Sequence, residues 1–163
     1  MKDKIKLEKE FIERIMRHQG ILNKICFVYM DSNMERDDLK QEIILQLWKS
    51  YPNFQGGSSF STWMYRVALN TALTFRKKNR TISFARVDDQ LVDPGPSMDY
   101  SEDIQTLYRA IARLNKIEKA IILLWLEEKT YQEIAATMGI SEKNVGVKLV
   151  RIKSKLASWI KDF

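Results

Sequence analysis

The chain has 163 residues, with 27 lysines and arginines against 21 aspartates and glutamates, so its formal net charge is +6. One cysteine, Cys26, and one histidine, His18, exclude an internal disulfide and a zinc site built from cysteines or several histidines. No apolar run reaches the ~20 residues of a membrane-spanning helix, and residues 1–10 alternate charge too densely for a signal peptide. We therefore expect a cytoplasmic protein without cofactor or metal, whose charge indicates an acidic partner.

The net charge is divided unevenly along the chain. Residues 1–87 carry +7, residues 88–108 carry −6 and residues 109–163 carry +5. The acidic segment holds two of the three prolines and lacks a helical apolar period, which predicts a flexible linker between two small domains. Residues 43–87 and 143–161 contain no acid and are rich in lysine and arginine. Two such tracts predict contact with a polyanion at two places, although basic side chains also solvate ordinary helix faces.

The first basic block, residues 1–87, is predicted to contain four helices. Apolar residues at helical spacing occur within residues 11–16, 21–29, 39–51 and 60–75. We expect the third helix to be capped by Asp37 or Asp38 and to end before Pro52. A polar loop with two glycines, Asn53–Ser59, follows it, and the fourth helix runs into four cations within five residues. Cations complement a helix C-terminus, but this number exceeds what a helix end requires.

The second basic block, residues 109–163, is predicted to contain a helix-turn-helix. Asn115–Glu118 and Thr130–Glu133 have the form of capping boxes, and the second opens a helix of about eight residues. Gly139 suits the left-handed turn that ends this helix, and Ser141 caps the next one. The buried stripe of that last helix consists of Val145, Leu149, Ile152 and Leu156. With no strand-period segment in either block, we expect an all-α fold of two small helical domains.

The exposed face of the last helix has side chains suited to a DNA major groove. Asparagine, lysine and arginine read base edges or phosphates, and Val147 can contact a thymine methyl group. Any helical hairpin with a glycine turn shares part of this pattern, but the cap, turn and basic face together favour DNA. The residues that we expect to contact duplex DNA are Ser141, Lys143, Asn144, Val147, Lys148, Arg151 and Lys155.

The loop before the fourth helix mixes aromatic, small polar and basic residues. Such a mixture suits unstacked single-stranded bases, because aromatic side chains stack on them. Phe60, Trp63 and Met64 at helical spacing are nevertheless typical of a hydrophobic core. From the residues alone, the core interpretation is the stronger of the two.

Both blocks together resemble a bacterial sigma factor of the extracytoplasmic-function (ECF) type, in the sigma-70 family. In the first block, the segments similar to region 2 of that family are Asp38–Glu42 with Leu47-Trp48, Tyr51–Phe54, and Phe60–Asn70. In the second block, the segments similar to region 4 are Leu114–Glu118, Tyr131–Ala135 and Met138–Ser141. The order of these segments, separated by an acidic linker, is more specific than any one of them.

The resemblance implies a division of roles between the blocks. Region 4, in residues 109–163, reads the −35 promoter element as duplex DNA. Region 2, in residues 1–87, binds the clamp helices of core RNA polymerase, melts the −10 element and holds a flipped base in the loop Asn53–Ser61. An inhibitory anti-sigma factor is a further implied partner.

The resemblance also assigns individual residues of the first block. Those that face the polymerase are Asp38, Leu39, Gln41, Glu42, Leu45 and Trp48. Those that contact −10 DNA are Asn53, Phe54, Gln55, Ser58, Ser59, Ser61, Trp63, Arg66, Asn70, Arg76, Lys77, Lys78 and Arg80. One departure concerns Gly146-Val147-Lys148, where many members carry an Arg-Ser-Arg-like run, so the promoter sequence does not carry over. Gly146 also lowers helix propensity by about 1 kcal/mol relative to alanine.

Two other functions compete with this one. A helix-turn-helix regulator that does not bind polymerase explains the second block equally well, and co-elution with core enzyme discriminates between them. A nuclease or recombinase is a different class. The basic tracts lack carboxylates for a metal, and no histidine lies near the serines of the loop, so we expect no enzymatic activity.

Overall fold

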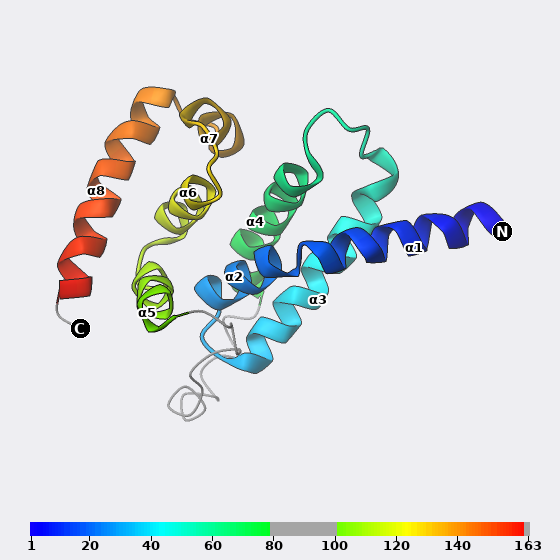
Figure 1. The fold of residues 1–163 in the computed structure, drawn as a ribbon, viewed down its shortest axis with the longest axis horizontal. Helices are drawn as coiled ribbons and strands as arrows, with labels where there is room; N and C mark the ends of the chain where they lie inside the picture. The colour runs from blue at the N-terminus through cyan, green and yellow to red at the C-terminus, as the bar shows by residue number, and fades with distance from the viewer. Residues whose placement is uncertain (79–100, 162–163) are drawn as a thin grey trace.

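Helices make up the described structure from end to end. The computed structural model describes residues 1–78 and 101–161, which form eight α-helices, one short 3-10 helix and no strand. The first block contains α1 (Lys2–Arg17), α2 (Gln19–Tyr29), α3 (Asn33–Ser50), η1 (Tyr51–Asn53) and α4 (Phe60–Lys78). The second block contains α5 (Glu102–Ile111), α6 (Lys116–Leu126), α7 (Tyr131–Met138) and α8 (Glu142–Lys161). The expected all-α fold is confirmed (Figure 1).

The start of α3 differs from the prediction. Its N-cap is Ser32, whose extended backbone precedes the helix and whose hydroxyl accepts a hydrogen bond from the Glu35 amide at 3.2 Å. Asp37 and Asp38, the caps predicted from the sequence, lie exposed inside the helix. The prediction was wrong because the Ser-x-x-Glu pattern that begins at Ser32 is the stronger start signal.

The segment predicted as a linker ends earlier than expected. Residues 102–108 form the first turns of α5, and Glu102 and Asp103 lie in its first turn, where negative charge is favourable beside the helix N-terminus. Two of the six acids assigned to the linker therefore belong to a helix. The remaining four, together with both prolines, fall outside the described residues.

Helix α2 lies at the centre of the molecule, and both blocks cover it. It contacts α1, α3 and α4 of the first block and α5 and α6 of the second. Its side chains are accordingly buried on several sides, from Ile21 and Leu22 to Val28 and Tyr29. A helix that is apolar nearly all round is typical of a core position. The two blocks therefore fold back on each other and share one hydrophobic core (Figure 1).

Helix α4 is buried on a wider face than the sequence predicted. Met64 and Ala68 are in the core as expected, but Tyr65, Leu69 and Ala72 are buried as well. The reason is that α4 packs on α2 and α3 and also meets α6 of the second block. A single apolar stripe read from the first block could not reveal this second neighbour.

The local signals of the helix-turn-helix are confirmed. Side-chain oxygens of Asn115, Thr130 and Ser141 accept hydrogen bonds from the backbone amides three residues later, at 2.9, 3.1 and 3.1 Å. Gly139 ends α7 in the left-handed conformation, with φ of 68°. The four-residue stripe of α8 is buried as predicted. In the first turn of α6, the apolar residue Ile117 is exposed.

Candidate nucleic-acid interface

The outer face of α8 presents most of the side chains predicted to contact duplex DNA. Lys143, Asn144, Val147 and Arg151 are exposed, while Lys148 is half-buried at the edge of the face. Val150 lies on the same face and is 70% exposed, and sequence reasoning missed it. Its spacing was the available signal, because it lies one turn after Val147, opposite the buried stripe.

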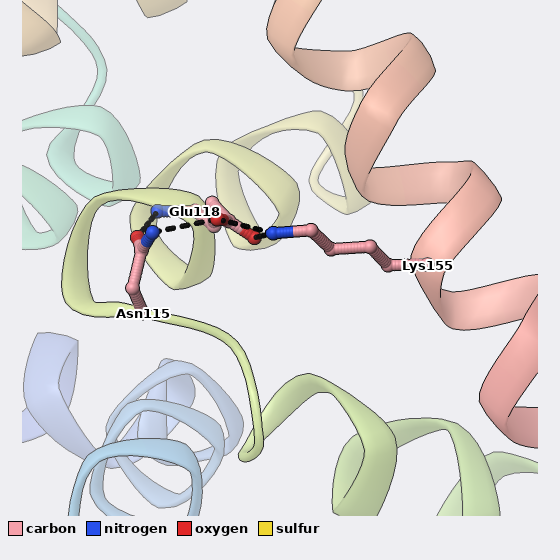
Figure 2. A network of polar contacts seen from close by, with 3 residues as sticks. All are labelled: Asn115, Glu118 and Lys155. Carbon is pink, nitrogen blue, oxygen red and sulfur yellow. Dashed lines mark hydrogen bonds and ion pairs between the residues drawn. The ribbon is translucent and has the colours of Figure 1, made fainter.

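Lys155 has a different neighbourhood from the other predicted contacts. Its Nζ donates to both carboxylate oxygens of Glu118, at 2.8 and 3.1 Å, and Asn115 Nδ2 donates to Glu118 Oε1 at 2.6 Å (Figure 2). The start of α6 is thereby tied to the second half of α8. Because Glu118 compensates its charge, we expect Lys155 to contribute less to phosphate binding than Lys143 or Arg151.

Gly146 lies inside α8 beside the aromatic ring of Tyr131. A methyl group built on Gly146 would lie 3.4 Å from Cε2 of that ring, which is ordinary van der Waals contact. Its backbone φ is not positive, since only Gly56 and Gly139 have that conformation among the described glycines. Packing and backbone geometry therefore do not require glycine at this position.

The loop between η1 and α4 rests on a cluster of aromatic rings. The Phe54 and Trp63 centroids are 4.9 Å apart, Phe60 and Trp63 are 5.4 Å apart, and Tyr51 lies 6.1 Å from Trp63. Phe54, Phe60 and Trp63 remain half-buried, so one part of each side chain packs while another reaches the surface. The core interpretation of these residues therefore holds, and it leaves surface for stacking.

Two residues of α1, missed by sequence reasoning, organise this aromatic cluster. The Arg14 guanidinium lies over the rings of Tyr51, Phe54 and Phe60, 5.9, 6.0 and 5.5 Å from their centroids. Glu10 pairs with Arg14 at 3.1 Å and accepts a hydrogen bond from the Tyr51 hydroxyl at 3.0 Å. Burial and this hydrogen bond raise the pKa of Tyr51. No local motif marks α1 as a neighbour of the loop, which explains why it was missed.

The polar residues of the loop have mixed surroundings. Asn53 and Gln55 are exposed, as a nucleic-acid contact requires, and Ser58 and Ser61 are half-buried. Ser59 caps the start of α4, because its hydroxyl accepts a hydrogen bond from the Thr62 amide at 3.2 Å. The Ser59 hydroxyl is therefore already engaged in capping α4.

The basic residues predicted along α4 fall into two groups. Arg66 and Asn70 are exposed and line a cavity of about 320 Å³ whose other wall is formed by residues of the second block, including Thr137 and Met138. Arg76, Lys77 and Lys78 fall within the last turns of α4. Arg80 lies outside the described residues.

The predicted polymerase surface on α3 needs one correction. Asp38, Gln41 and Leu45 are exposed, and Glu42 is half-buried. Leu39 is completely buried, so it belongs to the core of the first block and is removed from this surface. Trp48 packs on Phe11, with ring centroids 5.0 Å apart, and only part of it faces outward.

The described residues were also searched for a reactive thiol, a metal site and a membrane-spanning helix. Burial raises the pKa of the Cys26 thiol to about 12, so it stays protonated and poorly nucleophilic. Within residues 1–78 and 101–161, no group of three histidine, cysteine or acidic side chains could hold a metal ion. Over the same residues, none of the helices is both long and apolar enough to cross a bilayer.

Comparison with protein families gives two matches that follow the two blocks. The family model for sigma-70 region 2 matches residues 14–82. The family model for sigma-70 region 4 matches residues 104–156, which include α6, α7 and most of α8.

Individual relatives match most of the chain. The ECF RNA polymerase sigma factor SigX of Bacillus subtilis is 26% identical over 151 residues, covering 82% of this chain and 77% of the relative. The ECF RNA polymerase sigma-E factor of Escherichia coli is 25% identical over 164 residues, covering 91% and 85%. Among solved structures, the sigma factor RpoE of Bartonella quintana, in complex with the anti-sigma factor NepR, has a similar fold. It superposes with a TM-score of 0.74 at 20% identity, covering 94% of this chain and 98% of that one.

Proposed function

The chain belongs to the ECF group of the sigma-70 family, whose members bind core RNA polymerase and promoter DNA to direct transcription initiation, and we propose that its two blocks divide this work. The second block reads the −35 element, and the first binds the polymerase and the melted −10 element. The observation that carries this assignment is the capped helix-turn-helix, whose outward face is basic and free of acid from Lys143 to Lys161. A promoter is thereby held at two places by one chain.

The second block supplies duplex recognition. Lys143, Asn144 and Arg151 project from the outer face of α8, where they reach phosphates and base edges when the helix enters a major groove. Val147 and Val150 bring apolar contacts to the same face. With fewer charged donors than an Arg-Ser-Arg run, this face relies more on apolar contact with bases.

The first block supplies strand capture. Exposed Asn53 and Gln55 on the loop offer hydrogen-bond groups to an unstacked base, while the surface of the aromatic cluster offers a stacking partner. Arg66 and Asn70 continue this path along α4, and Arg76–Lys78 extend it toward the end of the helix. Phosphate contacts in this region position the strand and supply the salt dependence of binding.

Helix α3 supplies the polymerase contact, through Asp38, Gln41 and Leu45 with the outward part of Glu42 and Trp48. An exposed leucine among acidic and polar groups suits a partner with an apolar center and a basic rim. The cytoplasm is the location that this partner requires, and the chemistry of transcription belongs to the polymerase rather than to this chain. An anti-sigma factor is a further partner, by analogy with the Bartonella quintana complex.

Purified chain and core RNA polymerase test the proposal directly. We expect co-elution as a complex and transcripts from defined start sites on genomic fragments. Changing Asp38 and Leu45 to alanine should weaken co-elution at least about tenfold, because interface centres concentrate binding energy. Asp37→Ala, at an exposed neighbour outside the proposed surface, is the matched control. Duplex binding without any co-elution would instead identify a regulator that works without polymerase.

A further inference from the structure

Aromatic residues lie at both ends of the loop Asn53–Ser61. Tyr51 and Phe54 lie at its entry, where the Phe54 amide donates to the Tyr51 carbonyl oxygen at 3.0 Å. Phe60 lies at its exit, with its ring centroid 5.9 Å from that of Phe54 in an edge-on contact. Between these ends, Gly56 has φ of 74°, a conformation that glycine adopts readily. Because glycine adds conformational freedom, the shape of the loop depends on contacts that hold its two ends together.

Arg14, on α1, contacts the rings at both ends of this loop. Its guanidinium carbon lies within 6.0 Å of the ring centroids of Tyr51, Phe54 and Phe60, and cations are attracted to the faces of aromatic rings. The end of α1 also reaches Phe60 through His18, whose ring centroid is 5.2 Å from that of Phe60. His18 is fixed in turn, because its Nδ1 donates to the Arg14 carbonyl oxygen at 2.8 Å. One side chain of α1 therefore bridges the entry and the exit of the loop.

Glu10 fixes the position of Arg14. Its Oε1 atom lies 3.1 Å from Nη2 of Arg14 and accepts a hydrogen bond from the Tyr51 hydroxyl at 3.0 Å. Tyr51 is 6% exposed, so this carboxylate oxygen is held by a buried side chain. An arginine on a helix surface otherwise samples many rotamers, and ordering it has an entropic cost. The ion pair therefore keeps the guanidinium above the rings before any ligand arrives.

The charge of Glu10 argues against a simple phosphate contact at this place. A carboxylate beside a nucleic-acid strand repels phosphates and lowers the affinity. It also compensates the charge of Arg14, whose side chain is 36% exposed. Arg14 is therefore better suited to hold the rings than to bind a phosphate. Because charge and positioning have opposite effects at Glu10, an experiment can separate them.

We propose that Glu10 and Arg14 are positioning residues for strand capture, and that they hold the two ends of the loop in the shape that receives an unstacked base. Arg14 acts through Phe54 and Phe60, and Glu10 acts through Arg14. A loop that already has its bound shape loses less conformational entropy on binding, which raises its affinity for the base. This inference rests on the proposed capture of the −10 strand by the loop.

A fluorescent base in a single-stranded probe tests the inference in the full-length chain. The probe is a thymidine oligonucleotide of about 20 nucleotides with one central 2-aminopurine, whose fluorescence decreases when the base stacks on an aromatic ring. The decrease at saturation measures stacking, and the midpoint of the titration measures affinity. A phosphate contact alone changes the midpoint and leaves the decrease at saturation unchanged.

Two variants with opposite charge changes give the decisive comparison. Arg14→Met lowers the net charge by one, whereas Glu10→Gln raises it by one and still accepts a hydrogen bond from the Tyr51 hydroxyl. We expect both variants to lose at least about half of the fluorescence decrease, because the rings are no longer held from α1. We expect Arg14→Met to bind the probe at least about threefold more weakly, and Glu10→Gln to bind it no more tightly than the wild type.

Controls on the same helix separate positioning from charge. Arg17→Met and Glu13→Gln make the same two charge changes at exposed positions of α1. We expect their fluorescence decrease to equal that of the wild type, while their affinity follows the charge. Arg14→Lys, which keeps a cation above the rings, should retain most of the decrease. Circular dichroism checks that each variant is folded.

Three results would overturn the inference. The first is a wild-type fluorescence decrease in Arg14→Met or in Glu10→Gln. The second is an affinity that follows net charge in both of these variants and in both controls. The third is a loss of stacking in Arg14→Lys as large as that in Arg14→Met.

Phe54→Leu distinguishes failure of the inference from failure of the proposed function. It removes one ring of the loop itself, so it should reduce the fluorescence decrease whether or not α1 positions the loop. A loss with Phe54→Leu but not with Arg14→Met would leave strand capture by the loop intact and refute the positioning role alone. If neither variant changed the decrease, or the wild type showed none, the loop would not receive a base and both proposals would be refuted.

Discussion

Replacing Gly146 by alanine should stabilise the protein, although it adds a group beside an aromatic ring. Glycine inside a helix costs about 0.8–1.0 kcal/mol relative to alanine. The new methyl group would lie 3.4 and 3.9 Å from the Cε2 and Cδ2 atoms of Tyr131, which are contact distances rather than a clash. Tyr131 is exposed and can shift slightly. The propensity gain therefore prevails, and we expect the free energy of unfolding to rise by about 1 kcal/mol.

Urea titration and thermal unfolding followed by circular dichroism measure this change. For a chain of this size, 1 kcal/mol corresponds to a rise in Tm of about 2–4 °C. Gly139→Ala is the matched control, because Gly139 has φ of 68° and alanine is strained there. It should lose stability by about 1 kcal/mol, opposite in sign to Gly146→Ala.

A loss of stability in Gly146→Ala would refute the reasoning, since it would mean that the contact with Tyr131 cannot accommodate a methyl group. Duplex binding by the same variant then tells why glycine is present. Weaker binding without a loss of stability would place the DNA backbone close to Gly146. Unchanged binding would leave this glycine without a role in DNA contact.

Three further changes test separate parts of the structure. Glu128, in the turn that follows α6, has φ of 60°, and Glu128→Gly should raise the free energy of unfolding by about 0.5–1 kcal/mol in a urea titration, because glycine adopts the left-handed conformation without strain; no gain would show that the turn is unstrained. On a duplex selected from a random library, replacing thymine by uracil should weaken binding of the wild type but not of a Val147→Ala, Val150→Ala variant, and equal losses would exclude methyl contacts. Alkylation of Cys26 by iodoacetamide at pH 8 should be on the order of a thousandfold slower than that of a free cysteine, since with a pKa of about 12 the thiolate forms only at higher pH. Rapid alkylation without denaturant would show that α2 is open to solvent.

The sequence was most informative where a short motif has a local cause. Capping by Asn115, Thr130 and Ser141 and the turn at Gly139 depend on hydrogen bonds within a few residues, so type and spacing were sufficient to predict them. The same reasoning failed at α3 only because Asp37 was preferred over the earlier signal at Ser32.

Contacts between segments far apart in the sequence could not be predicted from local motifs. The wide buried face of α4 depends on its packing on α2, α3 and α6, and the support of the loop by Arg14 depends on how α1 lies across it. Leu39 was assigned outward because its segment resembles a polymerase-binding motif, but only the packing of α3 shows that it faces the core. The residues predicted to face outward on α8 were largely correct, because the buried stripe of a helix determines which residues lie on its opposite, exposed face.

The central position of α2 also has a consequence during synthesis. The helix is complete at Tyr29, but the covering side chains of α6 end at Leu126, about 100 residues later. At about 5–20 residues per second, the ribosome needs roughly 5–20 s to produce that cover. During this interval one apolar flank of α2 is exposed on the nascent chain, which makes it a natural binding site for chaperones and a starting point for aggregation when translation stalls.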